Sequence, residues 1–289
     1  MIDVRIANLN GRLTLLNGED ALDVENESDG RFGPDPLSAF NEWHAFSDWM
    51  EGVRFDRPAA APFATTELET PVPRPSQIFA IGLNYADHAA ESKMTLPEHP
   101  IVFTKFASSL TGADVEVELT GDRVDWEAEL VVVIGRVGRN IGITSAWDHV
   151  AGLAVGQDIS DRSVQNRGTP AQFSLGKSFR GFAPVGPVVP LSQLPVGANR
   201  DALRISSVLT EVDGTRRTLQ DGTTADMIFS VPEIIHRLSA TVEFRPGDLI
   251  FTGTPSGVGL GREPQEFFRT GQKLTTEIEG LGSITQRIT

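Results

Sequence analysis

The residues after position 70 form short apolar runs separated by turns that contain Gly and Pro, and this pattern limits the folds available to the chain. A helical spacing of three or four residues is clear in only two later segments, 144–150 and 225–238. The apolar runs cover residues 78–81, 101–106, 130–134, 185–189 and 249–252. Because strands follow one another with few helices between them, the pattern predicts a β-rich sandwich or roll and not a doubly wound α/β sheet.

The first 70 residues have a different pattern. Two Asn-Gly dipeptides, beginning at Asn10 and Asn17, are strong hairpin turns and predict a small β-ribbon. Residues 35–53 carry apolar side chains at helical spacing and predict one amphipathic helix. Prolines recur between residues 57 and 76 and predict a semi-rigid linker. The sequence therefore predicts a small N-terminal domain with its linker, residues 1–70, and a second domain, residues 71–289.

Composition excludes several classes of function. The formal net charge of −14 and the lack of a Lys/Arg-rich block predict no nucleic acid partner. No apolar run approaches the roughly 20 residues that a membrane helix requires, so no membrane partner is expected. The absence of cysteine excludes disulfides, zinc-thiolate sites and thiol nucleophiles. The start of the chain lacks the features of a signal peptide, which predicts a cytoplasmic location.

Two glutamates begin the apolar run 130–134 and predict a metal site. Strand alternation places Glu127 and Glu129 on one face together with Val131 and Val133. An isolated pair of this kind usually lies on a solvated surface, but here the face continues into valines and is expected to be covered. Buried paired anions need a cation or protons to offset their repulsion and desolvation.

A third carboxylate, Asp158, follows a short apolar element, although alone it would be typical of a turn or a helix cap. With Glu127 and Glu129 it forms a set of oxygen ligands with no nearby His or Cys. Such a set suits Mg²⁺ or Mn²⁺ better than zinc, and leaves positions for water and a chelating substrate. The sequence therefore predicts one divalent ion per subunit.

The order and spacing of four motifs resemble the fumarylacetoacetate hydrolase family, in its branch of acylpyruvate hydrolases and 2-hydroxyhepta-2,4-diene-1,7-dioate isomerases. The motifs are E-x-E at 127–129, D-x-S-x-R-x-x-Q at 158–165, GKSF…FAPVGP at 176–187 and TGTPSGVG at 252–259. The resemblance spans roughly residues 76–289. It implies a β-rich α+β fold, a mixed β-sandwich roll with a small N-terminal α/β appendage, and a homodimer.

The resemblance also implies catalytic roles. The family pattern G-x-N-Y-x-x-H-x-x-E is matched from Gly82 to Glu91. On a helix His88 and Glu91 share a face, so the carboxylate can orient the imidazole and raise its basicity. In relatives that hydrolyse acylpyruvates, this pair activates water and its segment closes over the substrate as a lid. Lys177 aligns with the active-site lysine of the family, which would neutralise charge on the attacked carbonyl or the enolate.

Four further residues match substrate-contacting positions of the family. Lys105 aligns with a lysine near the metal site, and Thr254 aligns with a substrate-contacting threonine beside two glycines. Arg162 and Gln165 match the family spacing; they could contact the substrate or hold Asp158 in a structural hydrogen-bond network, and the sequence does not choose between these roles.

One departure from the family bears on the substrate. Many relatives carry an acidic residue where this chain has Arg180. If its side chain points into the cleft, it would favour a second carboxylate on the substrate, whereas an outward side chain would say nothing about specificity.

The first functional hypothesis is metal-dependent hydrolysis of a C–C bond in a small diketo acid, similar to an acylpyruvate or fumarylpyruvate, through a metal-stabilised enolate. The alternatives are decarboxylation of oxaloacetate, and isomerisation or hydration of 2-hydroxydienoates. All three use a small 2-oxo acid as partner and the same chelation, so the sequence does not separate them. A non-catalytic binding protein is disfavoured because all the ligands and the His88–Glu91 pair are present.

Overall fold

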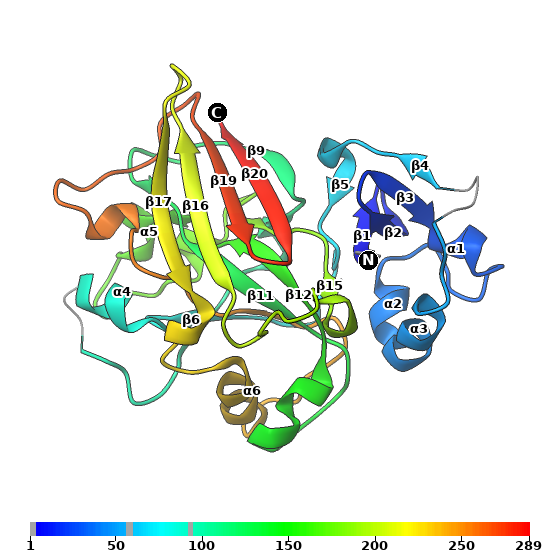
Figure 1. Ribbon diagram of the computed structural model, residues 1–289. Helices are drawn as coiled ribbons and strands as arrows, with labels where there is room; N and C mark the ends of the chain where they lie inside the picture. The colour runs from blue at the N-terminus through cyan, green and yellow to red at the C-terminus, as the bar shows by residue number, and fades with distance from the viewer. Residues whose placement is uncertain (1–3, 56–59, 92–94) are drawn as a thin grey trace.

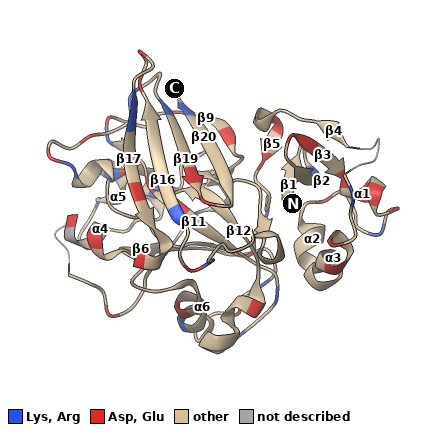
Figure 2. Ribbon diagram, in the orientation of Figure 1, with Lys and Arg blue, Asp and Glu red and all other residues tan. Residues whose placement is uncertain are grey.

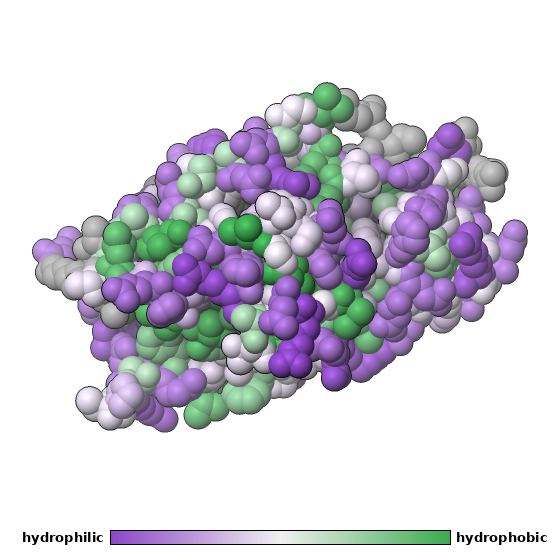
Figure 3. All heavy atoms as spheres, turned by 90° about the horizontal axis from the view of Figure 1, so that it is seen from below, coloured by the Kyte–Doolittle hydropathy of each residue, from purple (hydrophilic) through white to green (hydrophobic). Residues whose placement is uncertain are grey.

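The computed structural model describes residues 4–55, 60–91 and 95–289, which form a small N-terminal lobe and a larger main lobe (Figure 1). Acidic residues are spread over both lobes (Figure 2). The face in Figure 3 is largely hydrophilic, with hydrophobic residues in small groups. Within the described ranges, no helix is both long enough and apolar enough to cross a membrane.

The N-terminal lobe is built on a five-stranded sheet with the order β4-β3-β2-β1-β5. Its strands are β1 (Val4–Leu9), β2 (Arg12–Asn17), β3 (Asp20–Asp23), β4 (Ala61–Pro62) and β5 (Leu68–Glu69). The predicted ribbon is confirmed: Asn10 and Gly11 both have positive φ, as a tight turn between β1 and β2 requires. The boundary near residue 70 stays a prediction.

The single helix predicted over 35–53 is wrong in one respect. The segment forms two helices, α2 (Leu37–Asn41) and α3 (Trp43–Met50), because Glu42 leaves the helical conformation at φ −118° and ψ 36°. Phe40 and Phe46 are still buried, so the apolar face was identified correctly. A further short helix, α1 (Val24–Glu27), is capped by the Asp23 side chain, which accepts a hydrogen bond from the Asn26 N–H.

The first sheet of the main lobe has six strands in the order β15-β12-β11-β18-β6-β7. Its strands are β6 (Ile78–Gly82), β7 (Ile101–Thr104), β11 (Ala128–Ile134), β12 (Val150–Gln157), β15 (Val189–Pro190) and β18 (Leu249–Phe251). Four predicted apolar runs lie in these strands. The run 185–189 does not, except at Val189, since residues 185–188 contribute only isolated bridges.

A second sheet of five strands, in the order β17-β16-β19-β20-β9, was missed by the sequence analysis. Its strands are β9 (Asp114–Val117), β16 (Arg204–Thr210), β17 (Arg216–Thr223), β19 (Lys273–Ile278) and β20 (Gly282–Ile288). Side chains from both sheets share one hydrophobic cluster, for example Leu130 and Val132 with Ile205, Ile278 and Ile284. The main lobe is thus strand-rich and mixed α/β, while the sandwich-roll description stays a prediction.

Short elements complete the lobe: β8 (Leu110–Thr111), β10 (Val124–Asp125), β13 (Ser160–Asp161), β14 (Ala183–Pro184), α4 (Ala86–Glu91), α5 (Arg162–Gln165) and α6 (Val231–Ser239). The helix predicted over 225–238 begins later, at Val231, because Ser230 caps it through the Glu233 N–H. The helix predicted over 144–150 is a 3₁₀ helix, Ile143–His149.

Candidate active site

The three predicted metal ligands meet where β11 begins and β12 ends. One carboxylate oxygen from each of Glu127, Glu129 and Asp158 lies within 4.8 Å of the other two. Antiparallel pairing of β11 with β12 brings them together, and the Asp158 N–H donates to the Glu127 carbonyl at 2.9 Å. All three side chains are buried, Glu129 and Asp158 almost completely. The strand alternation read from the sequence therefore leads to a buried cluster and not to a solvated face.

The three carboxylates differ in the number of cationic side chains that contact them. The Lys177 ammonium lies 2.8 Å from Glu127 Oε2 and 2.7 Å from Asp158 Oδ2. Although burial opposes ionisation of Glu127, Lys177 and Arg162 lower its pKa to about 2. Glu129 accepts a hydrogen bond from the Gly253 N–H at 2.9 Å and forms no ion pair among the described residues. Burial, together with Asp158 and Glu127, raises the pKa of Glu129 well above its ordinary value.

This imbalance fits a divalent cation. Three carboxylates supply hard oxygen ligands, and one of them, Glu129, has no cationic partner in the parts of the chain that the structure describes. A buried carboxylate without such a partner is costly unless a proton or a cation neutralises it. The residues present could therefore hold Mg²⁺ or Mn²⁺.

Lys105 contacts the cluster through Asp158 and has no exposed side-chain surface. Its ammonium is fully buried, lies 2.5 Å from Asp158 Oδ1 and also donates to the Lys177 carbonyl. Burial lowers the pKa of Lys105, and the Asp158 charge opposes this shift. The side chain is placed to orient Asp158, and the substrate contact predicted for it stays a prediction.

The His88–Glu91 pair lies on α4 and faces the same region. His88 Nδ1 is 3.4 Å from Glu91 Oε2, which is long for a hydrogen bond. The Gly257 N–H lies 3.1 Å from each oxygen of the Glu91 carboxylate and donates to it. A Cβ added at Gly261 would lie 2.4 Å from Glu91 Cδ, so a larger residue there would displace the Glu91 carboxylate.

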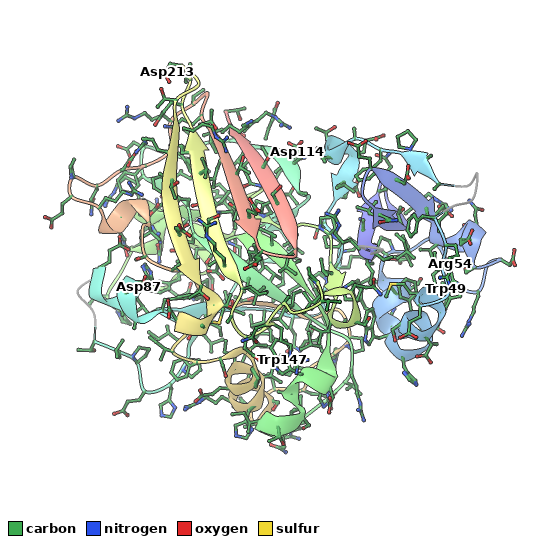
Figure 4. All side chains as sticks on the ribbon, in the orientation of Figure 1. Trp49, Arg54, Asp87, Asp114, Trp147 and Asp213 are labelled. Carbon is green, nitrogen blue, oxygen red and sulfur yellow. The ribbon has the colours of Figure 1, made fainter. Side chains whose placement is uncertain are left out.

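A second contact fixes α4 to the same loop. The Ser256 hydroxyl donates to Asp87 Oδ2 at 2.6 Å, and Figure 4 shows Asp87 on α4 at the side of the main lobe. We call residues 252–261 the glycine loop. It holds α4 through two carboxylates, those of Asp87 and Glu91, and in this way sets the position of His88.

Asp125 is a site residue that the sequence analysis missed. It is fully buried and accepts hydrogen bonds from the Gly259 and Leu260 N–H groups at 2.7 and 2.9 Å and from Arg162 Nε at 2.8 Å. Arg162 Nη1 in turn lies 2.7 Å from Glu127 Oε1. The sequence could have indicated it, because Asp125 stands two positions before Glu127, with Trp126 between them.

The network predicted for Arg162 exists, but it holds a different ligand. Arg162 Nη1 contacts Glu127 and donates to Gln165 Oε1 at 2.8 Å, whereas Asp158 is held by the lysines. Thr254 Oγ1 accepts a hydrogen bond from Gln220 Nε2 at 2.7 Å. Gln220 was not identified from the sequence, because the strand that carries it, β17, was missed.

A cavity of about 470 Å³ opens onto these groups. Seven predicted residues line it: His88, Glu91, Glu127, Arg162, Gln165, Lys177 and Thr254. The other three, Lys105, Glu129 and Asp158, lie deeper and do not line it. Arg180 is exposed and also outside the lining, so it offers no charge to a bound substrate.

Six apolar residues that were not predicted also line the cavity. We call them the distal wall: Ile81, Leu83, Phe103, Phe173, Val258 and Leu260. Polar and charged residues, Asn166, Arg262, Glu263 and Gln265, complete the lining together with Gly82, Gly261 and Pro264. Phe103 and Phe173 form an edge-to-face pair with ring centroids 5.7 Å apart. The lining of the cavity therefore combines charged residues and a proton-transfer pair with an apolar, partly aromatic group.

Several known proteins are similar to this chain in sequence and in fold. A family model described as fumarylacetoacetate hydrolase, C-terminal, matches residues 77–289. The oxaloacetate tautomerase YisK of Bacillus subtilis is 41% identical over 228 residues, covering 77% of this chain and 73% of that protein. A solved structure from Mycobacterium smegmatis is 47% identical, covers 99% of both chains and has a TM-score of 0.91. A fumarylpyruvate hydrolase from Pseudomonas aeruginosa, solved with Mn²⁺ and pyruvate, is 30% identical, covering 81% of this chain and 93% of its own, with a TM-score of 0.65.

Proposed function

This chain is an enzyme of the fumarylacetoacetate hydrolase family, and on that basis we propose that it catalyses metal-dependent enol–keto tautomerisation of a 2-oxo acid. The observation that carries the proposal is the convergence of His88 and Glu91 with Glu127 and Lys177 on one cavity. A proton-transfer pair facing a cation-binding cluster supplies the two parts that enolisation needs. The similarity to an oxaloacetate tautomerase supports this reaction, with oxaloacetate as the reference substrate.

Glu127, Glu129 and Asp158 would hold one Mg²⁺ or Mn²⁺ ion. When bound, the ion supplies Lewis acidity, which lowers the free energy of the enolate form of a chelating 2-oxo acid. Lys177 adds a fixed positive charge beside the same carboxylates, where negative charge on the substrate oxygen would develop. Lys105 and Arg162 keep Asp158 and Glu127 in place.

His88 moves the proton. In the ketonisation direction the enol hydroxyl releases its proton to solvent, and protonated His88 gives a proton to C3 of the acid. The net change is one proton moved from oxygen to carbon, and His88 regains its proton from solvent. Because Nδ1 faces Glu91, Nε2 is the nitrogen left for the substrate. The glycine loop holds Glu91 and so fixes the ring.

The test follows the ultraviolet absorbance of enol-oxaloacetate with metal-stripped protein, before and after addition of Mg²⁺ or Mn²⁺. We expect acceleration only with the metal. His88→Gln should lower the rate about 100- to 10,000-fold while metal binding persists. The matched control is His44→Gln, a histidine whose side chain is 95% exposed on α3. A metal-independent rate, or full activity of His88→Gln, would reject the proposal.

Hydrolysis of a C–C bond in an acylpyruvate is a second candidate. It is favoured by the similarity to a fumarylpyruvate hydrolase and by the His88–Glu91 pair, which could activate water. The His88–Glu91 pair would take a proton from water as the water oxygen bonds to the acyl carbonyl carbon. The C–C bond would then break toward the pyruvate enolate, and the same proton would go to C3 of pyruvate. Release of pyruvate together with the matching free acid identifies this reaction, whereas pyruvate with carbon dioxide from oxaloacetate identifies decarboxylation.

We also propose, from the family resemblance, that the protein is a homodimer, and from its sequence that it is cytoplasmic. Light scattering after size-exclusion chromatography tests the first proposal, since a single monomeric mass would reject it. Fractionation of native cells tests the second.

A further inference from the structure

We propose that the distal wall selects a 2-oxo acid with an uncharged, apolar substituent on C3, so that phenylpyruvate is preferred to oxaloacetate. The two acids share the carboxylate and oxo group that chelate a metal, and differ in the C3 substituent, which is a phenyl ring in one and a carboxylate in the other. The inference rests on the proposed function and names the substrate class of the same site.

The aromatic part of the wall begins next to the catalytic charges. The Lys177 ammonium lies 5.2 Å from the centroid of the Phe103 ring, and the Phe103 ring packs edge-to-face against Phe173. An acid whose oxo group faces Lys177 and Glu127 would therefore direct its C3 substituent along Phe103 and Phe173, where a phenyl ring can join the edge-to-face arrangement.

The charges lining the cavity do not suit a second carboxylate. Three lysine and arginine side chains line it in the described residues, and each is already paired: Lys177 with Glu127 and Asp158, Arg162 with Asp125 and Glu127, and Arg262 with Glu266 at 3.2 Å. The fourth basic residue of the lining, His88, lies beside Glu91. Arg262 also donates to the Leu219 carbonyl at 2.9 Å.

The distal carboxylate of oxaloacetate would thus leave water without gaining a cation. Glu91 lies in the same lining and would repel it. A carboxylate buried in this way is strongly disfavoured unless a partner compensates its desolvation.

The size of the cavity supports the same conclusion. At about 470 Å³ it falls within the range of about 300–1,000 Å³ that is typical of sites for larger ligands. A small dicarboxylate would leave the distal wall in contact with water. A phenyl group would displace that water and bury apolar surface on both partners.

The first experiment compares the two acids on the wild-type, metal-loaded enzyme. We expect kcat/KM for ketonisation of enol-phenylpyruvate to exceed that for enol-oxaloacetate by about tenfold. Calorimetry should give the same order for binding, and does not depend on turnover. Equal or stronger binding of oxaloacetate overturns the inference, as does failure of both acids to bind. Preferential binding of phenylpyruvate without turnover of either enol supports the inference and rejects tautomerisation.

A second experiment locates the selectivity at Phe173. Phe173→Leu should lower the phenylpyruvate-to-oxaloacetate ratio of kcat/KM about fivefold, and Phe173→Arg should reverse the preference by supplying a cation. The control is Phe106→Leu, a phenylalanine that is 49% exposed and outside the cavity. An unchanged ratio in Phe173→Leu, with a circular dichroism spectrum like that of the wild type, overturns the assignment to Phe173 even if Phe173→Arg does not fold.

Discussion

Asp125 and Glu129 are both buried carboxylates, four positions apart, but their surroundings differ. Asp125 accepts hydrogen bonds from the N–H groups of Trp126, Gly259 and Leu260 and pairs with Arg162. Glu129 receives one N–H, from Gly253, and no cation among the described residues. A carboxylate with a full set of donors stabilises the fold, whereas one with an incomplete set is available to a metal ion.

The largest effect is expected when the incomplete carboxylate loses its charge. Glu129→Gln should lower metal-dependent turnover about 1,000-fold or more, because a ligand charge is removed from the ion. Without metal its free energy of unfolding should not fall, since the substitution removes repulsion with Asp158 and Glu127. Turnover assays and urea unfolding measure both quantities, with Glu118→Gln, an exposed glutamate, as control. Full turnover of Glu129→Gln would show that Glu129 is not a metal ligand and would contradict the contrast drawn with Asp125.

The opposite result is expected at the carboxylate with the full donor set. Asp125→Asn should lower the free energy of unfolding by about 3–5 kcal/mol with or without metal, because Arg162 loses an anionic partner and the amide NH₂ replaces one of the two oxygens that accept hydrogen bonds from Arg162 and the loop N–H groups. Urea unfolding measures this change, and Asp122→Asn, at an exposed position, is the control. Metal affinity should change less than in Glu129→Gln. The contrast is wrong if Asp125→Asn is as stable as the wild type.

Metal removal sharpens the same comparison. At a free metal concentration of about 100 times Kd, the ion should stabilise the wild type by about 2.7 kcal/mol, and a chelator should remove this gain. Asp125→Asn should keep the metal-dependent gain from its lower baseline, whereas Glu129→Gln should lose it. Unfolding of each variant with and without chelator is the measurement. If a chelator lowered the free energy of unfolding of Glu129→Gln as it does for the wild type, the ion would not be bound by Glu129.

The smallest effect is expected at the attachment of α4 to the glycine loop. Ser256→Ala removes the hydrogen bond to Asp87 and should cost about 1 kcal/mol, or about fivefold in kcat, because His88 is held less firmly. Metal affinity should stay unchanged in Ser256→Ala, because this contact positions α4 and does not touch the metal ligands. Ser192→Ala, at an exposed position, is the control. A loss confined to metal affinity would contradict the role in positioning α4.

The sequence predicted the buried cluster of Glu127, Glu129 and Asp158. E-x-E alternation and the position of Asp158 depend on local spacing, and spacing along one strand determines which side chains share a face. The same reasoning located the first sheet, whose strands are apolar runs. The second sheet was missed although β16 alternates buried and less buried residues. Three of its four outward positions are Arg204, Ser206 and Thr210, and Ser207 lies on the buried face, so the run does not look apolar.

The distal wall and the partners of the ligands could not be predicted in the same way. Phe103, Phe173 and Leu260 come from a strand and two separate loops, and only the tertiary fold brings them to one cavity. Lys105 illustrates the limit in another form. The family resemblance placed it near the metal site, but only the structure shows that its ammonium is buried against Asp158 and is not part of the cavity lining.

The parallel pairing of β6 with β18 has a consequence for the order of folding. Gln77 and Asp248, which hydrogen bond where these strands begin, are 171 positions apart. Joining such distant segments costs chain entropy before any contact compensates for it, so the step is expected to be late and slow. α4 follows β6 and the glycine loop follows β18, so His88 and Thr254 meet only after this closure. A ribosome-bound chain still lacking β18 should therefore have all three acidic ligands but no working site.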